Sequence, residues 1–214
     1  MNKNVYSIVL TDNVIRAVDD EAYRRGTNRS NLINQILAEY LSCVTPEMRM
    51  RQIFDSAEAL LRREMLLMQQ NTPSVLMLKT ALQYKYRPTV NYKIELERNP
   101  ELYMGRLKVQ IRTQNELLKT YFERFFTEVA CIEENVLRDY GFNGYKSGVS
   151  KDCFTRLLVN NPSLGEEEKG AVIGEYLNML DETVKEFFAC DMELDHALAK
   201  YQDRFIIFTD KHKI

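Results

Sequence analysis

The sequence predicts a mainly α-helical protein with a small antiparallel sheet, divided into a short N-terminal strand-helix-helix module and a larger, largely helical α+β domain. Apolar residues recur at helical spacing through most of the 214 residues. A two-residue alternation replaces that spacing near the N-terminus and again around residues 76–112. A connector ending in Thr45 and Pro46 separates the module, residues 1–44, from the domain, residues 45–214.

The composition favours a globular protein of a reducing compartment. The formal net charge is -2. The cysteines show no paired spacing and are expected to be small apolar fillers: Cys43, Cys131, Cys153 and Cys190. No secretory signal opens the sequence, and no apolar run is long enough to cross a bilayer. We therefore expect a cytoplasmic protein without a membrane partner.

Residues 5–10 alternate as expected for a strand that is covered on one side. The large apolar side chains share one face and the smaller ones share the other, with Tyr6, Ile8 and Leu10 on the first and Val5, Ser7 and Val9 on the second. A lone strand has no neighbour with which to form backbone hydrogen bonds. The segment therefore needs another strand to pair with.

Two short helices follow the strand. Thr11 is placed to cap the first helix through its hydroxyl, and Gly26 supplies the left-handed residue that ends it. Asn28 is placed to cap the second helix. That helix has an unusually wide apolar face, made of Leu32, Ile33, Ile36, Leu37, Tyr40 and Leu41. A module of about 40 residues is too small to cover this face alone. Two copies would cover it, with their strands paired antiparallel about a two-fold axis.

This pattern resembles the ribbon-helix-helix (Arc and CopG-like) family of DNA-binding proteins. The resemblance implies a dimer whose core is formed by Tyr6, Ile8, Leu10, Leu32, Ile33, Ile36, Leu37 and Tyr40. It also implies that the paired strands enter the DNA major groove, with Val5, Ser7 and Val9 facing outward and Lys3 at the entry of the ribbon. Of these strand residues only Ser7 can hydrogen-bond to a base edge, whereas the valines can touch thymine methyl groups.

The start of the second helix matches the site where this family binds a DNA phosphate. The matching residues are Thr27, Asn28, Arg29 and Ser30. Free backbone amides and the helix dipole would meet the phosphate there. The alternative is a well-capped turn without a ligand. The cations and carboxylates of residues 1–44 balance to zero, so phosphate attraction would depend on where the charges lie.

The first part of the larger domain is predicted to be a helix followed by strands. The helix should begin at Pro46 and run to about Gln70. A β-hairpin or three-stranded sheet is expected at about residues 76–112. Residues 79–112 carry five net positive charges with tyrosines between them. They could contact nucleic acid, or they could form a solvated face whose charges discourage edge pairing.

The rest of the domain is predicted to be helical. A long helix should cover residues 114–139, and Ser150 should cap a short helix that contains Phe154, Leu157 and Leu158. Two further helices should span residues 166–208 and meet near Cys190. The glycine-rich loop at 141–148 could bind an anion, but it lacks the Gly-Lys-Ser/Thr ending of a phosphate-binding loop.

No set of catalytic residues is apparent. Asp191, Asp195 and His196 could form a weak metal site, although acids at the start of a helix are also favoured by the helix dipole. Neither histidine, His196 or His212, lies in a motif that supplies a nucleophile or a nucleotide loop. We therefore expect no enzymatic activity, no cofactor and no bound metal.

These observations together favour a homodimeric, nucleoid-associated DNA-binding protein, such as a bacterial or mobile-element transcriptional regulator. The expected partners are double-stranded DNA, a second copy in a homodimer or higher even-numbered oligomer, and a protein or signal bound by the C-terminal domain. Two alternatives stay open. One is a structural or interaction protein that uses the module only to dimerise. The other is an accessory factor of plasmid partition or DNA transfer.

Overall fold

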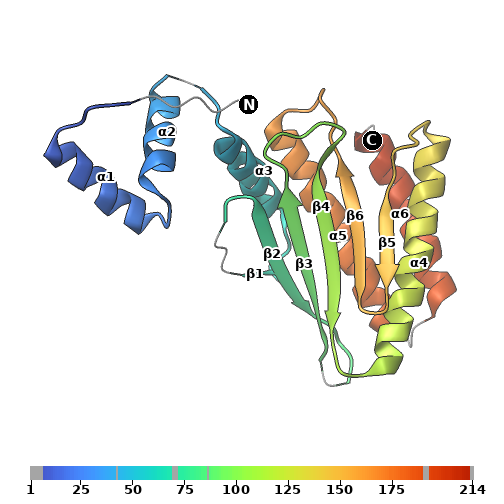
Figure 1. Ribbon diagram of the computed structural model, residues 1–214. Helices are drawn as coiled ribbons and strands as arrows, with labels where there is room; N and C mark the ends of the chain where they lie inside the picture. Colours follow the sequence, from blue (N-terminus) through green and yellow to red (C-terminus); the bar gives the residue numbers. More distant parts are fainter. Residues whose placement is uncertain (1–6, 42, 69–71, 86, 190–192, 213–214) are drawn as a thin grey trace. The chain divides into compact units, whose positions relative to one another are not determined.

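The computed structural model describes residues 7–41, 43–68, 72–85, 87–189 and 193–212. The chain divides into two compact units, Met1–Arg49 and Met50–Ile214. It combines helices with one antiparallel sheet, so the fold is mixed α+β (Figure 1). We predicted a small sheet, but the sheet has six strands in the described residues.

The first unit contains helices α1 (Asp12–Arg24) and α2 (Arg29–Tyr40). Thr11 takes the N-cap position of α1 with extended backbone, but its side chain makes no cap hydrogen bond, contrary to the prediction. Gly26 has a φ of 62°, and the Asn28 side chain accepts a hydrogen bond of 2.9 Å from the Asn31 amide, both as predicted.

The predicted strand of the first unit is not formed in this single chain. Residues 7–10 carry no strand, and Ile8 and Val9 are exposed, at 57% and 99%. Lys3, Val5 and Tyr6 lie outside the described residues. The physical reason is that an isolated strand has no backbone partner.

Helix α3 (Pro46–Leu60) ends about ten residues before the predicted position. Its end is held by Asn178, which donates a hydrogen bond of 2.8 Å to the Leu60 carbonyl and accepts one of 3.2 Å from the Arg62 amide. The following apolar residues then form the short strand β1 (Leu66–Leu67). A partner distant in sequence thus overrides the helical periodicity.

The sheet of the second unit has the strand order β1-β2-β3-β4-β6-β5, and every neighbouring pair is antiparallel. The predicted strands around residues 76–112 are confirmed, and they contribute the middle of this sheet. Its other strands are β2 (Val75–Ala81), β3 (Thr89–Leu96), β4 (Tyr103–Arg112), β5 (Ser147–Ser150) and β6 (Cys153–Val159).

Strand β6 replaces the short helix that we predicted after Ser150. Phe154, Leu157 and Leu158 have a spacing that also suits a helix. The side chains that point into the core are instead Phe154, Arg156 and Leu158, which follow the two-residue period of a strand. The prediction failed because the sequence pattern did not identify Arg156 as a buried residue.

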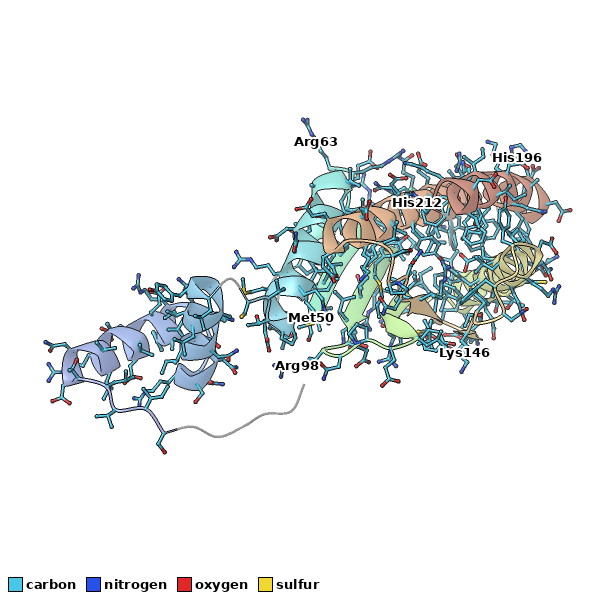
Figure 2. All side chains as sticks on the ribbon, turned by 90° about the horizontal axis from the view of Figure 1, so that it is seen from above. Met50, Arg63, Arg98, Lys146, His196 and His212 are labelled. Atoms are coloured by element: carbon cyan, nitrogen blue, oxygen red, sulfur yellow. The ribbon has the colours of Figure 1, made fainter. Side chains whose placement is uncertain are left out.

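Three long helices cover one face of the sheet: α4 (Glu116–Asp139), α5 (Glu166–Ala189) and α6 (Leu194–His212). All three were predicted. Figure 2 places Arg98 and Lys146 on the sheet side and His196 and His212 on the helix side. Alternate side chains of the central strands are buried under the helices, and the others face away from them. The second unit therefore has one covered and one open sheet face.

Candidate functional site

The wide apolar face of α2 divides into an inner and an outer part. Leu32 is fully buried and Ile33 partly buried in a small cluster with Val18 and Ala22 of α1. The outer part stays exposed in the single chain, with Ile36 at 48%, Leu37 at 46% and Tyr40 at 85%. Ile8 is also exposed, and Leu10 is half-buried. We call Ile36, Leu37 and Tyr40 the outer α2 face. The structure thus places only some of the expected dimer-core residues in the core of the single chain.

The start of α2 presents backbone amides at the surface. Asn28, Arg29 and Ser30 are exposed and Thr27 is half-buried. The Asn31 amide is capped by Asn28, while the amides of Arg29 and Ser30 stand in the first helical turn, where no preceding turn supplies an acceptor. Ser7 and Val9 are exposed as well. This helix terminus has the geometry that an anion requires.

Arg29 is not free at this terminus, which the sequence did not reveal. Its Nε and Nη2 atoms lie 2.6 and 2.5 Å from the two carboxylate oxygens of Asp19 in α1. The hydrogen bond from Arg29 lowers the pKa of Asp19, and the same bond raises the pKa of Arg29. A phosphate bound by Arg29 would therefore compete with Asp19.

Two further cations of the first unit are also paired. Arg24 and Arg25 both contact Glu21, with 2.5 Å between Arg25 Nε and Glu21 Oε1. The hydrogen bond from Arg25 lowers the pKa of the Glu21 carboxyl. Three arginines of this unit are thus paired with two carboxylates of the same unit.

The open face of the sheet carries the strongest local charge of the described sheet residues. The outward positions of β2, β3 and β4 hold five cations and one carboxylate. We call these residues the basic sheet face: Lys79, Lys93, Arg106, Lys108 and Arg112, with Glu95. Glu95 accepts contacts from Lys93 at 2.5 Å and from Arg106 at 2.5 Å, which lower its pKa.

Only one of the three described tyrosines in residues 79–112 lies near these cations. Tyr92 is fully buried on the opposite face, where its hydroxyl donates a hydrogen bond of 3.0 Å to Asp181 of α5. Tyr84 is partly buried against the core. Tyr103, at the start of β4, lines a pocket with Glu95 and Arg106, and its hydroxyl donates a hydrogen bond of 2.8 Å to the Gly144 carbonyl. The described part of this face therefore carries a single half-buried ring near its cations and not a row of rings for stacked bases.

These charges also do not serve to discourage pairing at an exposed edge of the sheet. Strands β3 and β4 lie in the middle of the sheet, and both of their edges are paired. Lys93 and Lys108 lie directly opposite each other in the register of these two strands. Charges at such positions cannot prevent edge-to-edge pairing.

A buried charged cluster, which we did not predict from the sequence, lies under the helices. Glu133 of α4 is fully buried and pairs with Arg156 of β6, with 3.4 Å between Arg156 Nε and Glu133 Oε2. The hydroxyls of Tyr145, Tyr176 and Tyr201 all donate hydrogen bonds to the same carboxylate. Burial raises the pKa of each of these tyrosines. A charged residue within an apolar pattern, such as Glu133 in the stripe of α4, is the sequence signal that could have indicated it.

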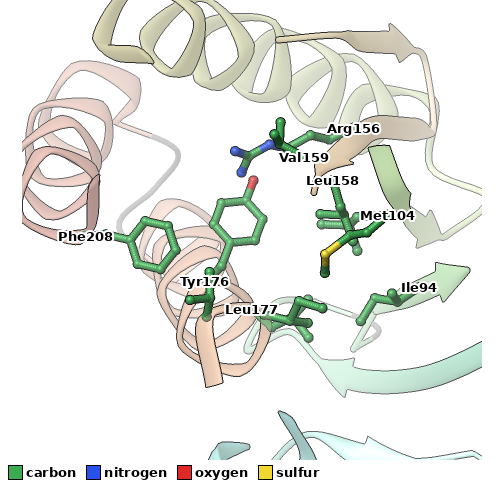
Figure 3. Close-up of a pocket in the computed structure, with 11 residues that line it drawn as sticks. Ile94, Met104, Arg156, Leu158, Val159, Tyr176, Leu177 and Phe208 are labelled. Carbon is green, nitrogen blue, oxygen red and sulfur yellow. The ribbon is translucent and has the colours of Figure 1, made fainter. Parts of the chain in front are cut away.

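A cavity of about 50 Å³ adjoins this cluster between the sheet and α5. Figure 3 shows Arg156 reaching toward the Tyr176 hydroxyl at its polar end, with Met104 and Leu177 on its apolar walls. The guanidinium carbon lies 4.4 Å from the centre of the Tyr176 ring. The cavity has room for water molecules but not for a ligand of substantial size.

The residues predicted as a weak metal site lie only partly within the described chain. No group of three His, Cys, Asp or Glu side chains within them is placed to hold a metal ion. Asp195 and His196 lie in the first turn of α6, and Asp191 lies outside the described residues. Gly141 has a φ of 83° and follows the end of α4, which accounts for it as a helix-terminating residue.

No known protein family, curated protein or solved structure matches this chain. Among the described helices, none has the length and apolar character needed to cross a bilayer.

Proposed function

We propose that this protein is a homodimeric DNA-binding protein, acting as a transcriptional regulator, whose paired N-terminal strands enter the major groove. The observation that carries the proposal is the exposure of the outer α2 face together with that of residues 7–9. A monomer would leave three large apolar side chains of one short helix in water.

A second copy of the chain would bury the side chains of the outer α2 face in a dimer interface. Fully burying one large apolar side chain stabilises a protein by about 1.5–3 kcal/mol, and a two-fold interface buries each residue twice. The same two-fold axis would bring two copies of residues 5–10 together as an antiparallel pair. Dimerisation and strand formation would therefore occur together.

The start of α2 would position this ribbon on the DNA backbone. The amides of Arg29 and Ser30 can donate to a phosphate oxygen, and Ser7 can hydrogen-bond to a base edge in the groove. Arg29 would add its charge only where a phosphate displaces Asp19. This predicts weak sequence preference, with backbone contacts supplying most of the affinity.

The second candidate function is that of an interaction protein, in which the first unit serves only for dimerisation. Its support is the internal pairing of Arg24, Arg25 and Arg29 with carboxylates of the same unit. Such pairing leaves few cations to attract phosphates.

A salt titration with random-sequence duplex DNA separates these functions. A groove-binding regulator should bind at low salt, and its affinity should fall steeply as salt rises. Ser7→Glu should weaken binding by introducing a carboxylate into the groove, whereas Glu39→Gln, on the exposed surface of α2, should not. No measurable affinity at low salt would reject DNA binding and leave the dimerisation role. If the protein does bind DNA, selection of bound sequences from a random pool would identify its target sites. Those sites would distinguish a transcriptional regulator from a partition or DNA-transfer factor.

A further inference from the structure

We propose that the basic sheet face of the second unit is an additional binding site for the phosphate backbone of double-stranded DNA. This inference rests on the proposed function and extends it, because it assigns DNA contact to the larger unit as well. The open sheet face is built from central strands, so it is a broad and continuous surface.

The cations of this face outnumber the carboxylates on the same face. Glu95 is shared by Lys93 and Arg106. Lys79, Lys108 and Arg112 make no ion pair with any described residue. In the first unit, by contrast, Arg25 and Arg29 are each paired with a carboxylate of the same unit. A polyanion would therefore be attracted to the sheet face.

The register gives a second, independent reason. Lys93 and Lys108 are directly opposite on adjacent strands, and like charges at opposite positions destabilise a sheet. Both side chains are half-buried, so neither is fully screened by water. A phosphate placed between them would turn this repulsion into two attractive contacts.

The chemistry of the face favours duplex over single-stranded nucleic acid. Single-strand sites combine cations with aromatic rings on which bases stack. Tyr92, the aromatic residue of β3, lies on the covered face instead. Tyr103 of β4 is a single half-buried ring near Arg106, with Lys146 Nζ 5.5 Å from its ring centre. Lysine and arginine side chains without a row of stacking rings bind phosphates and read no bases, so the contact should be independent of sequence.

A matched pair of double variants tests this site in the full-length protein. Lys93→Gln with Lys108→Gln removes two charges from the face, and Lys119→Gln with Lys200→Gln removes two from helices α4 and α6. For each protein, the logarithm of the affinity for random duplex DNA is plotted against the logarithm of the salt concentration. The slope for the sheet variant should be shallower than the wild-type slope by about two. The slope of the helix variant should equal that of the wild type.

Chemical protection locates the contact directly. Duplex DNA should slow acetylation of Lys79, Lys93 and Lys108, measured by mass spectrometry, and should leave Lys200 reactive. If DNA binds but the sheet lysines stay reactive and the slope is unchanged, the sheet site is wrong and the proposed function stands. If the wild type binds no DNA at low salt, both are wrong.

Two other outcomes distinguish the sheet site from groove binding by the ribbon and from binding of other anionic partners. If DNA protects the sheet lysines while Ser7→Glu leaves affinity unchanged, the sheet site stands and groove binding by the ribbon is wrong. If poly-glutamate or anionic phospholipid vesicles protect the same lysines at concentrations where duplex DNA does not, the partner is an acidic protein or a membrane surface, and the inference is overturned.

Discussion

In the first unit α2 is covered by one short helix, whereas in the second unit α5 packs against the sheet, α3 and α6. The result is that α2 keeps its outer face exposed, while α5 buries apolar residues almost all the way round. A small unit has too much surface for its volume, so it cannot cover a wide apolar face with its own residues. The second unit therefore covers the apolar residues of its long helix α5, whereas the first unit leaves part of the apolar face of α2 exposed in the single chain.

The two units also differ in the burial of their ion pairs. The first unit pairs its arginines at the surface, where each ion pair is screened by water. The second unit buries Glu133 with Arg156, where the loss of either partner leaves an uncompensated charge. Substitutions of these buried charged residues should therefore have large effects on stability, and substitutions of the surface pairs of the first unit should have small effects.

The largest effect is expected at Glu133. Glu133→Ala leaves the Arg156 charge unpaired in the core and removes the acceptor of three tyrosine hydroxyls. Unfolding in urea should show a loss of about 3–5 kcal/mol in the free energy of unfolding. The neighbouring exposed residue provides the control, because Glu134→Ala should change stability by less than about 0.5 kcal/mol. Equal effects of the two substitutions would contradict the role of the buried cluster.

A change in the outer α2 face tests whether the first unit needs a partner. Leu37→Glu removes one apolar contact from each copy and places two like charges near the two-fold axis. At about 1.4 kcal/mol for each copy, the dimer dissociation constant should rise by at least about a hundredfold. Sedimentation over a range of concentrations measures this constant, and Glu39→Gln is the control. A wild-type chain that sediments as a monomer at every concentration would show that the outer α2 face has no such partner.

The close approach of α5 to α3 tests the packing of the second unit. A Cβ atom added at Gly170 would lie 2.3 Å from the Ile53 carbonyl oxygen and 2.6 Å from Ser56 Cβ. Gly170→Ala should therefore destabilise the second unit by about 1–3 kcal/mol in thermal or urea unfolding. Gly148→Ala meets only the Thr155 side chain, at 3.1 Å, and should cost less. If Gly170→Ala were neutral, α3 and α5 would not be in contact as described.

The smallest effect is expected when the pH is lowered and the stability of the first unit is measured. The pKa values of Asp19 and Glu21 are lowered from 3.8 and 4.5 by their arginine partners. Their stabilising contribution is therefore present above these ordinary values and is lost as the pH falls through the lowered ones. NMR signals of residues 12–40 should report a loss of helix at acidic pH, and the combination Asp19→Asn with Glu21→Gln should flatten this pH dependence. A pH dependence that persists in this double variant would assign it to other groups.

Much of the helical structure could be predicted because helices depend on neighbours in sequence. The cap at Asn28 and the left-handed turn at Gly26 each involve residues within one or two turns. The predicted position of α4 was also correct for this reason. The early end of α3 depends instead on Asn178, far along the chain, and no local pattern contains that information.

The candidate sites could be predicted only in outline. The sequence indicated the start of α2 and the basic segment, but it could not show that Arg29 is held by Asp19 from another helix. It placed tyrosines and lysines together where the strand separates them onto opposite faces. The position of Glu133 in an apolar stripe could have suggested a buried charge, but the sequence could not show that its partner is Arg156.

By itself the sequence determined the mixed helical and strand composition, most helix boundaries and the amphipathic faces, because each follows from the spacing of nearby residues. Only the tertiary structure decided that β6 is a strand, that the basic residues lie on an open central face, and that Leu32 is buried while Tyr40 is exposed. These features depend on pairings between distant segments, which the order of residues along the chain does not specify locally.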